Sequence, residues 1–195
     1  TLNSIPKADN IYVDVVCDGD SDTFEFLAGW GVKRMLVREH SGAVKCRNLA
    51  IANCVVDGLI YATDDITFDP GAIESAMNTF NQHFLDDDGV VGFVQDLSFH
   101  PTGVALVGKK FLDRYPKRQL FCPQYYHFAA QEVLRCCEKL GKKFVADTNA
   151  KVRHLRPAVY KQEVDLTHIE ARKFKGRDLG LNLRRTEAGV VWPLG

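Results

Sequence analysis

Short apolar runs alternate with segments of helical spacing along this chain, and this alternation limits the folds it can adopt. Three early runs are rich in Val, Ile and Leu and lead into polar loops, as buried strands of a parallel sheet do: 11–17, 33–37 and 58–62. After the second run, Val44 and Leu49 begin a series of apolar residues at near-helical spacing. The pattern predicts an α/β domain.

The same pattern continues through the second half of the sequence. We expect further strands at 90–94, 103–108 and 142–145, and helices at 70–84, 128–140 and 166–174. A length of 195 residues suits one α/β domain and is short for two. We therefore predict a single three-layer α/β/α domain with a mostly parallel central sheet over residues 1–156. Residues 157–195 would form a C-terminal extension that could close over the active site.

Charge and cysteine usage exclude several classes of protein. Basic and acidic residues number 25 each, which argues against a nucleic-acid coat protein or a membrane-surface protein. Their distribution is uneven, because residues 151–195 hold 10 basic and 5 acidic side chains, about +5, and the remainder is about −5. The six cysteines show no C-x-x-C pair, so we expect them to be reduced. With no apolar run long enough for a membrane span and no leader, we expect a soluble, cytoplasmic protein.

Polar residues that follow the predicted strands are the candidates for chemistry, because ligands of open α/β sheets bind where strands end. An acidic loop follows the first strand at 18–22, Asp64 and Asp65 follow the third, and His154 follows an apolar stretch near the end of the domain. Together they could form a hard-cation site, with remaining positions filled by water or phosphate oxygens. Taken singly, adjacent carboxylates also fit a helix cap or a solvated turn, and a lone histidine is often structural. We expect the acidic run at 86–89 to be a solvated turn.

The order of these motifs resembles the inverting GT-A glycosyltransferases. The resemblance extends over about residues 5–155 and rests on these segments: Cys17-Asp18-Gly19-Asp20-Ser21-Asp22, His40-Ser41-Gly42, Cys46-Arg47-Asn48 and Tyr61-Ala62-Thr63-Asp64-Asp65-Ile66-Thr67-Phe68-Asp69-Pro70. It implies a GT-A fold and a sugar transfer from a nucleoside diphosphate donor, with uridine as the commonest base in that family. It also implies a divalent metal, Mn²⁺ or Mg²⁺.

The resemblance also implies individual roles. Asp18 would bind the nucleoside base, Arg47 would contact the nucleotide, and Asp64 would contact the donor. Asp65 and His154 would be the metal ligands. The sequence departs from the family at Thr63, where the D-x-D motif usually begins with Asp. It also begins too late to contain the family's first strand and most of its first helix.

An inverting transfer needs a base within hydrogen-bond reach of the acceptor hydroxyl, a contribution of about 10²- to 10⁴-fold in rate. The family places it at the start of a helix before the last strands, and Glu132 is the corresponding carboxylate here. A surface glutamate near a helix N-terminus is the alternative interpretation of Glu132. His127 and Asp96 are the reserve candidates.

Two other functions remain open at this point. The chain could bind a nucleotide sugar or a protein partner without turnover, or it could be a sugar-phosphate nucleotidyltransferase. The latter usually carries a Gly-rich phosphate loop after its first strand, which is not visible here. The acceptor is not specified by any motif. The basic C-terminal region motivates the hypothesis of a polyanionic acceptor, such as DNA that bears a hydroxylated base.

Overall fold

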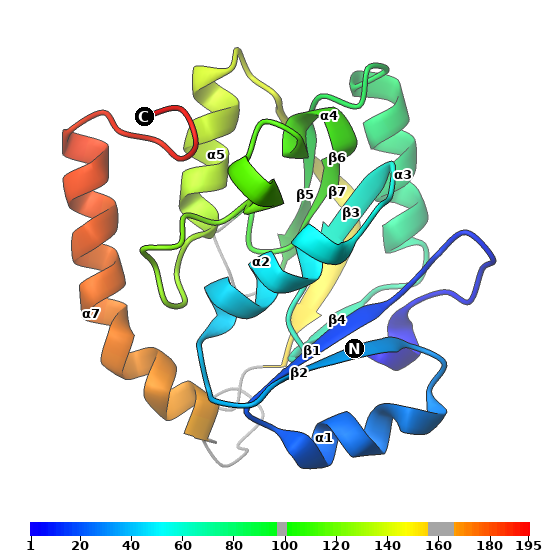
Figure 1. The fold of residues 1–195 in the computed structure, drawn as a ribbon. Helices are drawn as coiled ribbons and strands as arrows, with labels where there is room; N and C mark the ends of the chain where they lie inside the picture. Colours follow the sequence, from blue (N-terminus) through cyan, green and yellow to red (C-terminus); the bar gives the residue numbers. More distant parts are fainter. Residues whose placement is uncertain (97–100, 156–165) are drawn as a thin grey trace.

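The computed structural model describes residues 1–96, 101–155 and 166–195, with side chains from residue 169 onward in the last range. Two separate sheets form the framework. The first contains β1 (Asp14–Asp18) and β2 (Lys33–Val37), paired in parallel. The second has five strands in the order β3-β6-β5-β7-β4. Figure 1 shows β1 and β2 beside α1 (Ser21–Phe26), at one end of the molecule.

The five-stranded sheet is mixed, so the expected mostly parallel sheet is wrong. Its strands are β3 (Gly58–Tyr61), β4 (Ile66–Phe68), β5 (Val90–Gln95), β6 (Ala105–Gly108) and β7 (Phe144–His154). Only β5 and β7 run parallel, whereas β6 is antiparallel to both of its neighbours and β4 is antiparallel to β7. A buried run looks the same in either direction, since burial on both faces selects apolar residues regardless of strand orientation.

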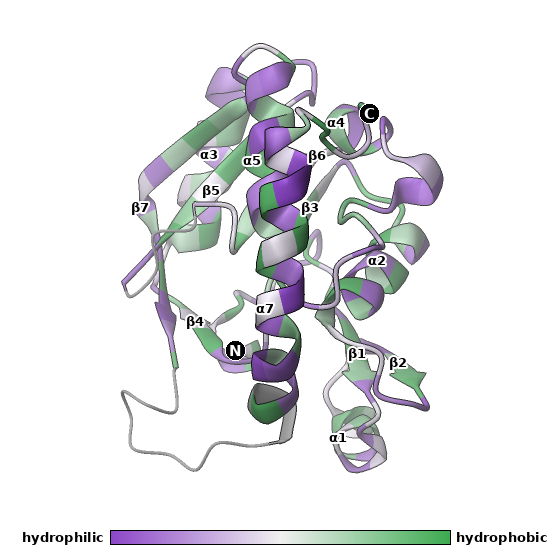
Figure 2. Ribbon diagram, turned by 90° about the vertical axis from the view of Figure 1, so that its left-hand side faces the viewer, coloured by the Kyte–Doolittle hydropathy of each residue, from purple (hydrophilic) through white to green (hydrophobic). Residues whose placement is uncertain are grey.

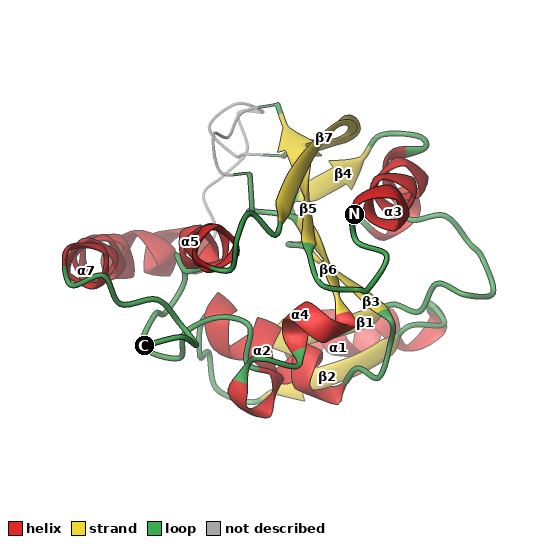
Figure 3. Ribbon diagram, turned by 90° about the horizontal axis from the view of Figure 1, so that it is seen from above, coloured by secondary structure: helices red, strands yellow, loops and turns green. Residues whose placement is uncertain are grey.

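Helices cover both faces of this sheet, as Figure 3 shows from above. On one face, α3 (Ala72–His83) packs Ile73 and Phe80 against β5, β6 and β7. On the other face, α2 (Ala43–Asn53), α4 (Lys109–Leu112) and α5 (Ala130–Lys139) enclose the second part of the core. The expected order of helix, sheet and helix layers is therefore present.

The C-terminal helix α7 (Leu166–Glu187) lies outside α5, at the edge of the molecule (Figure 1). It extends well beyond the helix expected at 166–174. The remaining helical elements are short 3-10 turns: η1 (Leu2–Ser4), η2 (Leu27–Gly29) and η3 (Pro116–Arg118). Among the described residues, no helix has both the length and the apolar character that crossing a membrane requires.

The acidic run at 86–89 is more than a solvated turn. The Asp88 side chain is 5% exposed, and Arg114 donates to both of its oxygens, with Lys143 at 3.2 Å. Asp86 pairs with Lys110 at the surface. The run therefore connects the end of α3 to α4 and to the start of β7 through charged contacts.

Candidate functional site

A short antiparallel pairing brings Asp65 and His154 together. Ile66 in β4 lies opposite His154 in β7, so the residue that precedes β4 reaches the end of β7. His154 Nε2 lies 2.7 Å from Asp65 Oδ2, and the Leu155 amide donates to the Asp65 carbonyl at 2.6 Å. Two residues that are 89 positions apart in sequence thus form one polar pair at the edge of the sheet.

The surroundings of Asp65 keep its carboxylate ionised. Burial alone would raise the pKa, but hydrogen bonds with His154 and Thr63, together with the electrostatic interaction with His154, outweigh it and lower the pKa of Asp65 to about 2. Asp65 Oδ1 and His154 Nδ1 are both buried, and neither has a hydrogen-bond partner among the described residues. One carboxylate oxygen and one imidazole nitrogen are therefore left without a bonding partner.

Asp65 and His154 carry groups that suit a metal ion, but the two residues do not form a complete site alone. Carboxylate oxygen and imidazole nitrogen bind Mn²⁺ and other first-row divalent metals. In the described ranges, however, no group of three or more His, Cys, Asp or Glu side chains is arranged to hold a metal ion. Asp65 and His154 fit a metal that takes its other ligands from water and from phosphate oxygens, as Mg²⁺ sites that bind phosphates do.

Asp64 lies on the exposed side of the same loop. The Thr1 hydroxyl donates to the Asp64 carbonyl and, at 2.5 Å, to the Ile66 carbonyl. These bonds hold the backbone between β3 and β4. The backbone of Asp64 is therefore fixed by a contact with Thr1, the residue that precedes η1. The structure places Asp64 beside Asp65, as the sequence requires, and does not test its role toward a donor.

Arg47 approaches this loop from α2. Its guanidinium carbon lies 5.5 Å from the centre of the Phe121 ring, a distance that allows a cation–π contact. Burial lowers the pKa of Arg47, and the interactions with Tyr61, Asp65 and Asp64 act in the opposite direction. Arg47 forms no salt bridge with any side chain in the described part of the chain. It remains charged at neutral pH because the pKa of arginine is normally above 12.

Asp18 ends β1 and binds backbone of its own chain. Its two carboxylate oxygens accept hydrogen bonds from the Ser41 amide at 2.7 Å and the Gly42 amide at 2.8 Å. His40 Nδ1 lies 3.1 Å from the same side chain. Asp18 therefore fixes the loop that leads into α2, and the structure leaves its expected contact with a nucleoside base untested.

Gly42 is required at its position in this loop. Its φ is +89°, and an added Cβ would lie 2.7 Å from the Tyr126 carbonyl oxygen. That oxygen accepts from the Val44 amide at 3.1 Å, so the loop packs directly against the backbone before α5. Only glycine allows this approach without strain.

The first part of α7 adds residues to this region that the sequence did not single out. Glu170 Oε2 lies 2.9 Å from His40 Nε2 and accepts from the Tyr126 hydroxyl at 3.3 Å. The Tyr126 ring stacks on Phe174, with 3.8 Å between ring centres. Glu170 thus continues a chain of contacts from Asp18 through His40 to α7. No sequence signal marks it, because one glutamate in a basic helix is usually a solvated side chain.

Glu132, the expected base, is buried inside the protein. Its side chain is 3% exposed, and Oε1 accepts from Arg185 Nε at 2.9 Å and from the Trp192 amide at 2.8 Å. These contacts hold α7 and the C-terminal residues against α5. An acceptor molecule in solvent does not reach the Glu132 carboxylate in this conformation, so a role as base would require α7 to move.

The two reserve candidates for the base lie in different surroundings. The His127 amide donates to Asp178 at 2.8 Å, and the His127 ring contacts Phe128. Asp96 follows β5, is exposed, and accepts from the His154 amide at 3.0 Å. Asp96 is therefore an exposed carboxylate beside the Asp65–His154 pair.

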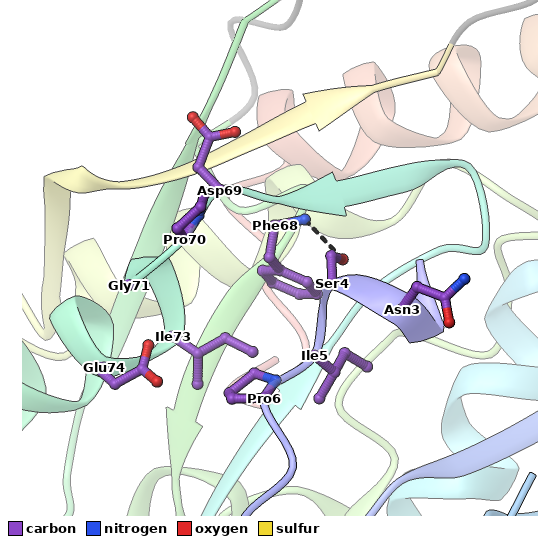
Figure 4. A pocket seen from close by; sticks show the side chains of 10 residues that line it. All are labelled: Asn3, Ser4, Ile5, Pro6, Phe68, Asp69, Pro70, Gly71, Ile73 and Glu74. Atoms are coloured by element: carbon purple, nitrogen blue, oxygen red, sulfur yellow. Dashed lines mark hydrogen bonds between the residues drawn. The ribbon is translucent and has the colours of Figure 1, made fainter.

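A cavity of about 160 Å³ lies elsewhere, between η1 and the start of α3 (Figure 4). Ile5, Pro6 and Ile73 form its apolar side, and the Phe68 amide donates to Ser4 at 3.0 Å on its wall. Its lining includes Phe68, Asp69 and Pro70 from the end of the Tyr61–Pro70 segment, but none of the residues to which a role was assigned. We therefore base the candidate site on the Asp65–His154 pair, with Arg47 and Asp64 beside it.

Comparisons with known proteins relate the fold to transferases. No family model and no curated protein matches the sequence. The crystal structure of GalNAc-T7 with UDP, GalNAc and Mn²⁺ aligns with a TM-score of 0.57 and 10% identity, over 73% of this chain and 37% of that chain. The mannosyltransferase PcManGT from Pyrobaculum calidifontis, in complex with GDP-Man and Mn²⁺, aligns with a TM-score of 0.56 and 13% identity.

The alignment with PcManGT covers 74% of this chain and 47% of that chain, so the chain spans less than half the length of either neighbour. At this level of identity the likeness concerns the fold. The chain is structurally similar to GT-A transferases, as the order of its motifs predicted.

Proposed function

We propose that this chain binds a nucleoside diphosphate sugar together with a divalent metal, and transfers the sugar to an acceptor hydroxyl. The contact between Asp65 and His154 carries this proposal, because it brings a carboxylate oxygen and an imidazole nitrogen within 2.7 Å of each other at the end of the sheet. Support comes from the two structural neighbours, whose structures hold UDP with Mn²⁺ and GDP-Man with Mn²⁺.

We assign each residue around the Asp65–His154 pair a separate contact with the donor. Asp65 and His154 would hold the metal, which would supply positive charge to the departing diphosphate, an effect of several kcal/mol in related chemistry. Arg47 would add a cation beside the same phosphates, because a guanidinium forms strong charge-assisted bonds with phosphate oxygens. Asp64 would contact the donor, and Asp18 would contact the base at the edge of the loop that it fixes.

The transfer itself would be a direct displacement. The acceptor oxygen bonds to the anomeric carbon, the bond between that carbon and the diphosphate oxygen breaks, and the configuration inverts. A base takes the acceptor proton. We assign this role to Asp96 in preference to Glu132, since Asp96 is exposed beside His154 and Glu132 is enclosed by Arg185 and the C-terminal residues.

A second candidate is a domain that binds a nucleotide sugar without turnover. The enclosed position of Glu132 and the lack of a three-residue metal group among the described side chains favour it. Binding of donor and metal would then be normal, whereas no sugar would be transferred to water or to any hydroxyl.

Donor hydrolysis tests the proposal without knowledge of the acceptor. We expect slow release of UDP or GDP from the corresponding sugar nucleotides in the presence of Mn²⁺, and a first-formed free sugar of inverted anomeric configuration in proton NMR spectra. Asp96→Asn should lower the rate and leave donor affinity unchanged. Retained configuration would refute the displacement, and donor binding with no release would select the second candidate. Release of pyrophosphate from a nucleoside triphosphate and a sugar phosphate would instead identify a nucleotidyltransferase.

A further inference from the structure

The inner face of α7 is fully used in packing. Asp178 is completely buried and accepts hydrogen bonds from three consecutive backbone amides, at residues 126–128. Phe174 stacks on Tyr126, and Arg185 pairs with Glu132. These contacts fix the rotation of the helix, so its opposite face must point into solvent.

This outer face is strongly basic. Between residues 169 and 187, five basic side chains are exposed and only one acidic side chain is, Glu187. Within the described part of the chain, the salt bridges of α7 involve Glu170 and Arg185, neither of which is among the five. Of the five, Arg177 also donates to the Gln124 carbonyl at 3.3 Å. The exposed cations are Arg172, Lys173, Lys175, Arg177 and Arg184.

Two glycines lie in the middle of this face. Gly176 and Gly180 are about one helical turn apart, and a Cβ added to Gly176 would meet nothing within 4 Å. A Cβ added to Gly180 would meet only Arg184 Nη1, at 3.5 Å. The helical period of about 3.6 residues places Lys173, Arg177 and Arg184 on one side of these glycines, and Arg172 and Lys175 on the other. Ile169 and Leu183, seven residues before and after Gly176, lie on the same line of the helix and are exposed, so the central strip of the face is bare backbone at the glycines and apolar toward both ends, with cations beside it.

We propose that this outer face of α7 binds the phosphate backbone of a nucleic acid, which is the acceptor of the sugar. The acceptor role rests on the proposed transferase function, whereas the binding does not. Regularly spaced phosphates would lie along the strip and neutralise the cations on both sides. On the inner side of the same helix, Glu170 contacts His40, which contacts Asp18, the residue expected to bind the nucleoside base.

An anionic membrane surface fits the helix less well. An interfacial helix inserts a continuous apolar face between lipid head groups. The aromatic side of α7 faces the protein instead, with Phe174 against Tyr126. Figure 2 looks onto the exposed side of α7, where hydrophilic segments alternate with a few apolar ones. The apolar ones include Ile169 and Leu183, which lie on the line of Gly176, and Leu179 beside it, and they are separated from one another by the glycines.

Fluorescence anisotropy with a short labelled DNA duplex, the matching single strand and an RNA of the same sequence tests the proposal. We expect binding to at least one of them that weakens steeply between about 50 and 200 mM salt. Lys173→Glu with Arg184→Glu should reduce the slope of log affinity against log salt by about two, since each lost phosphate contact accounts for about one. Lys7→Glu, the same change at an exposed lysine far from α7 in sequence, should leave the slope unchanged.

A second variant separates a binding defect from a folding defect. Gly176→Glu places a carboxylate in open space on the strip, so it should preserve the fold and lower affinity about tenfold or more, which corresponds to about 1.4 kcal/mol. Gly176→Gln is the uncharged control and should bind nearly as well as the parent. Equal affinity of the Glu and Gln variants would overturn the proposal, as would binding to anionic phospholipid vesicles with none to nucleic acid.

Measurements of donor binding distinguish the α7 proposal from the proposed transferase function. The α7 variants should bind nucleoside diphosphate as the parent does, and Asp65→Ala should keep its affinity for nucleic acid. Nucleic-acid binding without donor binding would refute the transferase and leave the α7 surface in place. Donor binding with no salt-dependent nucleic-acid binding would refute the α7 proposal alone.

Discussion

Replacing Asp178 with alanine should destabilise the protein substantially, because this carboxylate holds the segment before α5 against α7. It accepts from the amides of residues 126, 127 and 128 at 3.1, 2.8 and 3.0 Å, and it is 0% exposed. A hydrogen bond to a charged group contributes about 1.5–3 kcal/mol. The contributions will not add fully, because the segment is partly exposed and water can reach some of the freed amides. We therefore expect a loss of about 2–4 kcal/mol.

Urea denaturation monitored by tryptophan fluorescence measures this loss. Trp192 packs near α5 and donates from its indole nitrogen to the Gln119 carbonyl at 2.7 Å, so its emission should change when the protein unfolds. Asp178→Asn retains one acceptor oxygen and should cost less than the alanine variant. Glu187→Ala removes an exposed carboxylate from the same helix and serves as the control. A cost below about 0.5 kcal/mol for Asp178→Ala, equal to that of a surface substitution, would refute the reasoning.

Three further predictions concern stability. Gly176→Ala should raise the free energy of unfolding by up to about 1 kcal/mol, because alanine favours the helix and its Cβ meets open space; an unchanged urea midpoint would contradict this. Gly42→Ala should lower it by more than about 1 kcal/mol, because of the positive φ and the 2.7 Å contact with a carbonyl oxygen, and wild-type stability would contradict that account. Burial raises the pKa of Asp88, but Arg114 and Lys143 outweigh burial and lower the pKa overall. The ionised Asp88 therefore contributes fully to the free energy of unfolding above the unfolded pKa of about 3.9, and this contribution is lost as pH falls through the folded pKa. Asp88→Asn should therefore flatten the acid side of a stability profile between about pH 2 and 5, and parallel profiles would contradict the assignment.

Much of the fold could be predicted from the sequence, because its strands are short apolar runs bounded by polar loops. The strand expected at 33–37 coincides with β2, and the strand expected at 58–62 differs from β3 by one residue. Strand direction was predicted wrongly, since direction is decided by connections and not by composition. β4 was missed because it has three residues, and it is the strand that places Asp65 beside His154.

The candidate site was predictable in part. The structure places Asp65 and His154 2.7 Å apart, and the expectation that they are metal ligands stays a prediction. The spacing of residues in the sequence does not show that Glu132 is buried in an ion pair. Its partner Arg185 is 53 residues away in a helix whose length was underestimated, so the buried ion pair has no local signature. Asp88 was misjudged for the same reason, because Arg114 lies 26 residues further along the chain.

Calorimetric titration of UDP and of GDP, with Mn²⁺ and then with chelator, tests the central claim most directly. We predict that at least one of the two nucleotides binds to the wild-type chain with Mn²⁺, that chelation weakens this binding, and that Asp65→Ala abolishes it. Asp22→Ala, which removes an exposed carboxylate from the first turn of α1, should bind as the wild type does. Binding of neither nucleotide to a folded wild-type chain, or binding that is unaffected by both chelator and Asp65→Ala, would contradict a metal-assisted donor site at Asp65 and His154.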